Sequence, residues 1–154
     1  MRVKRSAGIL MFRERDGVEV LIGHMGGPFW ENHDKAAWSI PKGEYTRDEP
    51  AIDAARREFE EELGLPVPPG DLLPLGDIRQ PGGKLVTIWA LHGDLAPDTI
   101  VPGTFSMEWP PHSGAYQDFP ELDRVAWLPP AIAHDKLVTG QRPFLDRLKE
   151  RVTG

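Results

Sequence analysis

The stretch GEYTRDEPAIDAARREFEEELGL, residues 43–65, decides the fold of this chain and raises a question about its charge. Four carboxylates, those of Glu58, Glu60, Glu61 and Glu62, crowd into five residues. Like charges one helical turn apart oppose helix formation by roughly 0.2–0.5 kcal/mol per pair. A folded chain that concentrates them there needs a compensating interaction.

The same stretch has the period of an amphipathic helix. Apolar residues recur at steps of three and four: Ile52, Ala55, Phe59 and Leu63. This spacing predicts one apolar stripe that faces the core. We expect Asp48 to be the N-cap, with Pro50 in the first turn, where its missing N–H costs little. Gly64 is expected to end the helix, and Pro66 cannot continue it.

The acidic residues of this helix fall on a different side from the apolar stripe. At about 100° per residue, Glu58, Glu61 and Glu62 share one sector, whereas Glu60 points elsewhere. Hard divalent cations such as Mg²⁺ prefer oxygen ligands. A cation between the three carboxylates would cancel their repulsion, so the pattern predicts a metal site. The alternative is a solvated acidic face, which is the usual meaning of a run of charges.

Composition limits the other function classes. The chain has 154 residues, with 18 Lys and Arg against 24 Asp and Glu, which gives a net charge of −6. The length fits a single domain over residues 1–154. An acidic chain is a poor candidate for broad binding to nucleic acid or to anionic membranes. It contains no cysteine, which excludes disulfides and thiolate metal sites. Because no apolar run reaches membrane-spanning length, we expect a cytoplasmic protein.

The rest of the chain alternates strand and helix patterns. Strand pairs joined by turns are expected over residues 6–25 and 71–94, the second around the turn PGGK, and a last strand over 123–128. Helices are expected over 129–138 and 142–152. Residues 95–120 are rich in Pro and Gly and are expected to form a long loop. Strands around a central helix, with helices again at the end, predict an α/β fold with a mixed sheet and helices on both faces.

Residues 43–65 match the signature of the Nudix hydrolase family at every fixed position. The signature is Gly, five residues, Glu, seven residues, Arg-Glu-hydrophobic, one residue, Glu-Glu, one residue and Gly-hydrophobic. The matching residues are Gly43, Glu49, Arg57, Glu58, Phe59, Glu61, Glu62, Gly64 and Leu65. Phe59 is a mild departure, because an aliphatic residue is more usual there. The resemblance implies the Nudix fold, an α/β/α sandwich around a mixed β-sheet. It also implies Mg²⁺- or Mn²⁺-dependent hydrolysis of a nucleoside diphosphate linked to another group.

The resemblance also implies roles for individual residues. The implied metal ligands are Glu58, Glu61, Glu62 and the backbone carbonyl of Lys42 or Gly43. Glu58 or Glu62 is expected to take the proton of the attacking water, and Arg57 to orient a carboxylate through a charge-assisted hydrogen bond. Glu121 is a further candidate metal ligand or base, since family members often use an acid from a later loop. The alternative for Glu121 is an ordinary surface charge.

The substrate is less well defined. WSIPKGE, residues 38–44, resembles the segment before the box in Nudix enzymes that act on dinucleoside polyphosphates, which would make Lys42 a phosphate contact. The tyrosine that marks many of those enzymes is not evident in RQPGGK, residues 79–84. Pro81 lies near a proline that marks ADP-ribose enzymes, but it also fits a turn. Dinucleoside polyphosphates, nucleoside triphosphates, and ADP-ribose or nucleotide sugars therefore all stay open, as does a non-catalytic nucleotide-sensing module.

Aromatic residues supply candidates for stacking on a nucleobase. We select Trp30, Trp38 and Trp109 as substrate contacts, with packing in the core as the alternative for each. The long segment over residues 95–120 could serve a dimer contact, and a homodimer is common in the family. The expected partner is therefore a small nucleotide or polyphosphate, together with a second copy of the chain.

Overall fold

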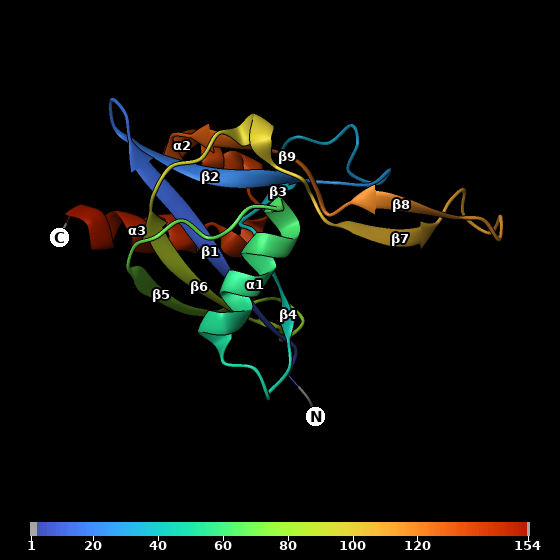
Figure 1. The fold of residues 1–154 in the computed structure, drawn as a ribbon, viewed down its shortest axis with the longest axis horizontal. Coiled ribbons are helices and arrows are strands. Elements are labelled where there is room, and N and C mark those ends of the chain that lie inside the picture. The colour runs from blue at the N-terminus through green and yellow to red at the C-terminus, as the bar shows by residue number, and fades with distance from the viewer. Residues whose placement is uncertain (1–2, 154) are drawn as a thin grey trace.

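The structure is a computed structural model that describes residues 3–153 (Figure 1). Its strands are β1 (Arg5–Glu14), β2 (Val18–Met25), β3 (Trp38–Ser39), β4 (Lys42–Tyr45), β5 (Leu72–Arg79), β6 (Leu85–His92), β7 (Thr104–Glu108), β8 (Tyr116–Pro120) and β9 (Leu122–Leu128). Its helices are α1 (Ala51–Leu63), α2 (Pro130–Lys136) and α3 (Pro143–Thr153), with short 3₁₀ turns η1 (Pro97–Thr99) and η2 (Thr139–Gln141). Among residues 3–153, no helix has the length and apolar content needed to cross a bilayer.

Seven strands form one mixed sheet. The order along the sheet is β3-β2-β1-β6-β5, with β4 also paired to β1 and β9 also paired to β2. Strands β1 and β6 run parallel, whereas the other pairs are antiparallel. The first residues of β1 pair with β4 and its last residues pair with β2. This arrangement places β4 directly beside the centre of the sheet.

Helices cover both faces of this sheet, as the sequence predicts. The side chains of β1 alternate between the two faces, as strand geometry requires. Ala7, Ile9 and Met11 pack in the cluster that contains Phe59 of α1. Leu10 packs instead in the cluster formed with α2 and α3. The predicted mixed α/β architecture with three layers is therefore confirmed.

Helix α1 begins and ends at defined residues, and one of the two predictions was wrong. The predicted N-cap was Asp48, but the helix starts at Ala51 after Pro50, and no side chain caps it. The fixed φ of proline brings the chain into the helix without such a cap. The predicted end is confirmed, because Gly64 adopts the left-handed conformation with φ of 67°. Its N–H donates to the carbonyl of Glu60 at 2.8 Å.

The segment over residues 95–120 is not the long loop that we predicted. It contains strands β7 and β8, which pair into a separate two-stranded sheet. Phe105 faces Phe119 across this pair, with ring centroids 6.1 Å apart. The hairpin projects away from the main sheet (Figure 1). The turn predicted at PGGK is confirmed, and the Gln80 N–H donates to the Lys84 carbonyl at 2.7 Å.

Candidate active site

The carboxylates of α1 line a cavity beside strand β4. Its volume is about 440 Å³. Six of its lining residues are ones that the sequence selected: Lys42, Gly43, Glu58, Glu61, Glu62 and Glu121. Glu121 reaches the cavity from the short connection between β8 and β9. The fold therefore gathers residues that lie 79 positions apart in the chain.

Gly43 lets strand β4 approach the helix closely. A Cβ built on Gly43 would stand 2.0 Å from the carboxyl carbon of Glu58 and 2.5 Å from its Oε1 atom. Any larger residue would displace this carboxylate. Gly8 on β1 plays a similar part beneath the strand, since a Cβ there would stand 2.3 Å from the Pro41 carbonyl oxygen. Gly8 therefore lets β1 lie close to the start of β4, and Gly43 lets β4 lie close to the acidic face of α1.

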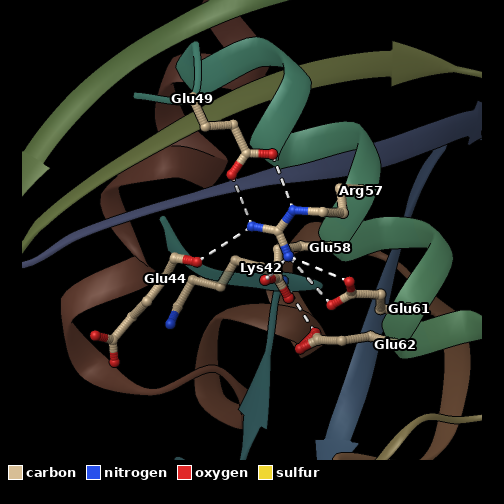
Figure 2. Close-up of polar contacts among 7 residues, drawn as sticks. All are labelled: Lys42, Glu44, Glu49, Arg57, Glu58, Glu61 and Glu62. Carbon is tan, nitrogen blue, oxygen red and sulfur yellow. Dashed lines mark hydrogen bonds and ion pairs between the residues drawn. The ribbon is translucent and has the colours of Figure 1, made fainter. Parts of the chain in front are cut away.

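Arg57 organises the acidic residues around it (Figure 2). Its Nε and Nη2 donate to the two oxygens of Glu49, each at 2.9 Å. Its Nη1 donates to Glu58 at 2.8 Å and to Glu61 at 3.2 Å, and Nη2 also donates to the Glu44 carbonyl at 3.3 Å. The bidentate pair lowers the pKa of Glu49 and raises that of Arg57. Glu49 thus anchors Arg57, and Arg57 in turn orients the two carboxylates on the helix.

Glu62 is the most deeply buried carboxylate of the cavity. Its exposed fraction is 9%. Burial raises the pKa of Glu62 to about 8, and the backbone N–H of Lys42 opposes this shift by donating to Glu62 Oε2 at 3.1 Å. Burial also raises the pKa of Glu58, despite its contact with Arg57. Both carboxylates therefore resist ionisation until a cation compensates for the lost hydration.

The residues present fit a hard divalent cation. Within residues 3–153, no three acidic or histidine side chains converge on one point as they lie, and Arg57 Nη1 bonds both Glu58 and Glu61. The donors are all oxygen atoms, burial raises the pKa values of three of the carboxylates, those of Glu58, Glu62 and Glu121, and Gly43 leaves room for the Glu58 carboxylate against β4. Oxygen donors of this kind suit Mg²⁺ or Mn²⁺.

Two lysines accompany the carboxylates. Burial lowers the pKa of Lys42, and the charge of Lys84 adds to this effect. In Figure 2 the Lys42 side chain extends toward Glu44, away from Glu58 and Glu62. Lys84 Nζ lies 3.7 Å from the Glu44 carboxylate. Lys84 was not among the site residues predicted from the sequence, although its place at the end of the PGGK turn, just before β6, was a usable signal.

The selected tryptophans lie in three different environments. Trp30 lines a second cavity, of about 350 Å³, together with Phe105. Trp38 belongs to the core and is only 4% exposed. Its indole N–H donates to Asp34, and its ring packs edge-on to His24. Trp109 follows the end of β7, in the turn of the projecting hairpin. The structure therefore brings only Trp30, of the three, to the candidate site.

The two cavities lie side by side and share three lining residues. Lys42, Glu62 and Glu121 line both of them. One end of the combined cleft is aromatic, with Trp30 and Phe105, and the middle is acidic. A ligand with an aromatic group attached to a phosphate chain matches this division of chemistry.

Comparison with known proteins identifies related sequences and folds. The family model of the NUDIX domain matches residues 2–148. No curated protein sequence matches the chain.

Three solved structures illustrate the shared fold. A Caenorhabditis elegans Ap4A hydrolase binary complex superposes with a TM-score of 0.66 at 18% identity, over 97% of this chain and 98% of that chain. The NUDIX domain of Shewanella oneidensis NrtR, in complex with ADP ribose, gives a TM-score of 0.65 at 16% identity, over 99% and 90%. A MutT protein from Methanosarcina mazei Go1 gives a TM-score of 0.61 at 20% identity, over 99% and 96%. At these identities the similarity establishes the fold alone.

Proposed function

Because the chain belongs to the NUDIX domain family, and is by that membership a pyrophosphohydrolase, we propose that it cleaves nucleoside diphosphates linked to a second group in a reaction that depends on Mg²⁺ or Mn²⁺. One observation carries this proposal. Helix α1 places Glu58, Glu61 and Glu62 in a cavity against Gly43, and that cavity lies beside an aromatic one.

The cation would be held by the carboxylates of α1. We assign Glu58, Glu61 and Glu62 as its ligands, with Glu121 and the backbone carbonyl of Lys42 or Gly43 as further ones. When bound, it would supply positive charge to phosphoryl oxygens and lower the pKa of a water molecule. Arg57 donates hydrogen bonds to Glu58 and Glu61 and so limits the directions in which these two carboxylates can point.

Glu62 is the best-placed proton acceptor for the attacking water. Arg57 already bonds Glu58 and Glu61, whereas Glu62 accepts one hydrogen bond within residues 3–153, from the Lys42 backbone. Its second oxygen is therefore free to take the proton. The water oxygen forms a bond to phosphorus, the bridging P–O bond breaks, and the departing phosphate carries the electron pair of that bond.

The substrate would lie along the cleft formed by the two cavities. Trp30 and Phe105 are placed to flank a nucleobase at one end, and Lys42 and Lys84 to contact phosphates beyond the carboxylates. Lysine binds phosphate as a point charge. These contacts favour a nucleotide with a phosphate chain, such as a dinucleoside polyphosphate or a nucleoside triphosphate. ADP-ribose and nucleotide sugars are the alternative, because the same contacts suit any base-linked pyrophosphate.

A nucleotide sensor without turnover is the competing function. A protein that only binds nucleotide has no need to keep three repelling carboxylates on one helix. Here all three are present, and Arg57 holds two of them in place. We therefore favour hydrolysis over sensing. The predicted homodimer and the cytoplasmic location stay predictions.

A substrate panel tests the proposal. The purified protein is incubated with Mg²⁺ and diadenosine tetraphosphate, ATP, ADP-ribose or UDP-glucose, and the products are separated by anion-exchange chromatography. We expect cleavage within the phosphate chain of at least one compound, and its loss in EDTA and in Glu62→Gln. Glu60→Gln, on the exposed side of the same helix, is the matched control. Tight binding of a nucleotide without any cleavage would establish the sensor instead.

A further inference from the structure

A buried histidine outside the candidate active site connects three parts of the chain. His24 lies on β2 and has no exposed surface. Its Nδ1 lies 3.0 Å from both carboxylate oxygens of Asp123 on β9. Its Nε2 lies 2.6 Å from the backbone carbonyl oxygen of His33. No local pattern singles out His24, because its partner Asp123 lies 99 positions away in the chain.

Both ring nitrogens of His24 face groups that can only accept hydrogen bonds. A backbone carbonyl never donates, and a carboxylate donates only when it is protonated. Asp123 also accepts a hydrogen bond from Arg124 at 3.1 Å. Two further charged side chains lie near His24. Arg124 and Lys136 lie over the Trp38 ring, which packs edge-on to His24. The Nε2 of His24 therefore carries a hydrogen and donates it to the His33 carbonyl, while Nδ1 faces the Asp123 carboxylate.

The loop over residues 26–37 receives one of these two hydrogen bonds. His33 contributes the carbonyl, and its ring stacks on Phe29 at 5.6 Å and lies edge-on to Trp30 at 6.1 Å. The loop's own backbone supports the cluster, because the His33 N–H donates to the Trp30 carbonyl at 2.9 Å. His24 thus holds the loop at the residue around which its aromatic cluster is packed.

The other hydrogen bond reaches the strand beside the active site. Asp123 lies two residues after Glu121, which lines both cavities. Backbone bonds add to this connection, since the Gly26 N–H donates to the Glu121 carbonyl at 3.1 Å. The aromatic and acidic walls of the cleft are therefore joined through His24 on one side and through the backbone of Gly26 on the other.

We propose that His24 is a positioning residue for nucleobase recognition. Through its contact with Asp123 and its hydrogen bond to the His33 carbonyl, it fixes the loop over residues 26–37 so that Trp30 forms the base-binding wall of the cleft. The inference rests on the proposed function, because it takes Trp30 as the contact for a base. It does not place His24 among the groups that touch substrate, since the ring is fully buried.

Two conservative variants separate the two hydrogen bonds. In His24→Asn the short amide can still donate toward Asp123 but no longer reaches the loop. In His24→Gln the longer amide reaches as far as Nε2 and can still donate to the His33 carbonyl. We expect amide hydrogen exchange at Trp30 and His33 to become at least about tenfold faster in His24→Asn. In His24→Gln it should stay near the rate of the parent.

Ligand binding then tests the role in recognition. The dissociation constants of ADP and of inorganic tripolyphosphate are measured by calorimetry in Mg²⁺, because only ADP carries a base. For His24→Asn we expect ADP to bind about tenfold more weakly, within the range that base stacking supplies. Tripolyphosphate should bind as it does to the parent, and His24→Gln should recover most of the ADP affinity. Equal weakening of both ligands would overturn the proposal, since it would indicate a general structural defect.

Measurements on the unmodified protein keep the test decisive if His24→Asn does not fold. ¹⁵N NMR of the His24 ring should show a hydrogen on Nε2, and a bare Nε2 would overturn the assignment. Unchanged amide hydrogen exchange at Trp30 and His33 in a folded His24→Asn would also overturn the proposal. If the parent binds neither ligand, the proposed function fails and the role in recognition falls with it. The ring spectrum and the exchange rates still decide whether His24 holds the loop.

Discussion

Replacing Glu62 with glutamine is expected to stabilise the metal-free protein at alkaline pH while removing its activity. Burial raises the pKa of Glu62 to about 8, from an ordinary value of 4.5. An acid whose pKa is raised by folding binds its proton more tightly in the folded state than in the unfolded state. The free energy of unfolding therefore falls as the pH rises from the ordinary value toward the raised one.

The size of this effect follows from the shift. Each pKa unit corresponds to about 1.36 kcal/mol, so a rise from about pH 5 to about pH 8 lowers the free energy of unfolding by on the order of 4 kcal/mol. Glutamine is neutral at every pH and has no such slope. Its amide hydrogens lose their water partners, at a cost of about 1–3 kcal/mol. Near pH 8, Glu62→Gln should therefore be more stable than the parent by on the order of 2 kcal/mol.

Urea unfolding followed by tryptophan fluorescence, in EDTA and at several pH values, measures this difference. Glu60→Gln is the matched control and should keep the pH slope of the parent. Adding Mg²⁺ should stabilise the parent more than Glu62→Gln. Turnover of Glu62→Gln should fall at least about hundredfold, as expected for the loss of a general base. A parent whose stability does not change across this pH range would refute the reasoning.

Three further substitutions and one matched control test the geometry of the cleft. Gly43→Ala would push Glu58 aside and should lower turnover about hundredfold with little change in melting temperature; normal activity would contradict the close approach. Arg57→Lys removes the bidentate guanidinium and should weaken Mn²⁺ binding about 10- to 100-fold, as measured by electron paramagnetic resonance. An unchanged Mn²⁺ affinity would show that Arg57 does not orient the metal-binding carboxylates. Trp30→Ala should weaken ADP binding about tenfold by calorimetry, whereas Trp109→Ala should leave it unchanged. The opposite result would make Trp109, and not Trp30, the base contact.

The central helix and its site could be predicted because the information is local. The apolar period of α1 and the carboxylates on its other side lie within one short stretch, and Gly64 ends the helix as expected. The same stretch supplied the resemblance to the family. The first residue of α1 was harder to predict. Pro50 brings the chain into the helix by its fixed φ, without a side-chain cap at Asp48.

What the sequence did not reveal depends on contacts between distant residues. The hairpin β7–β8 was missed because its Pro- and Gly-rich segment has no simple alternation, and only the facing pair of Phe105 and Phe119 indicates it. Trp38 was selected as a substrate contact, but burial against His24 removes it from the cleft. Lys84 enters the cavity because β6 pairs with β1 beside β4. Such placements follow from strand order, which patterns in one sequence specify weakly.

A crystal grown with Mn²⁺ and a nucleotide tests the metal site most directly. Anomalous diffraction at the manganese edge locates the ion independently of the protein atoms. We predict manganese within about 2.5 Å of oxygens from Glu58 and Glu62, between these side chains and the phosphate chain. A bound nucleotide with no manganese beside these carboxylates would contradict the account.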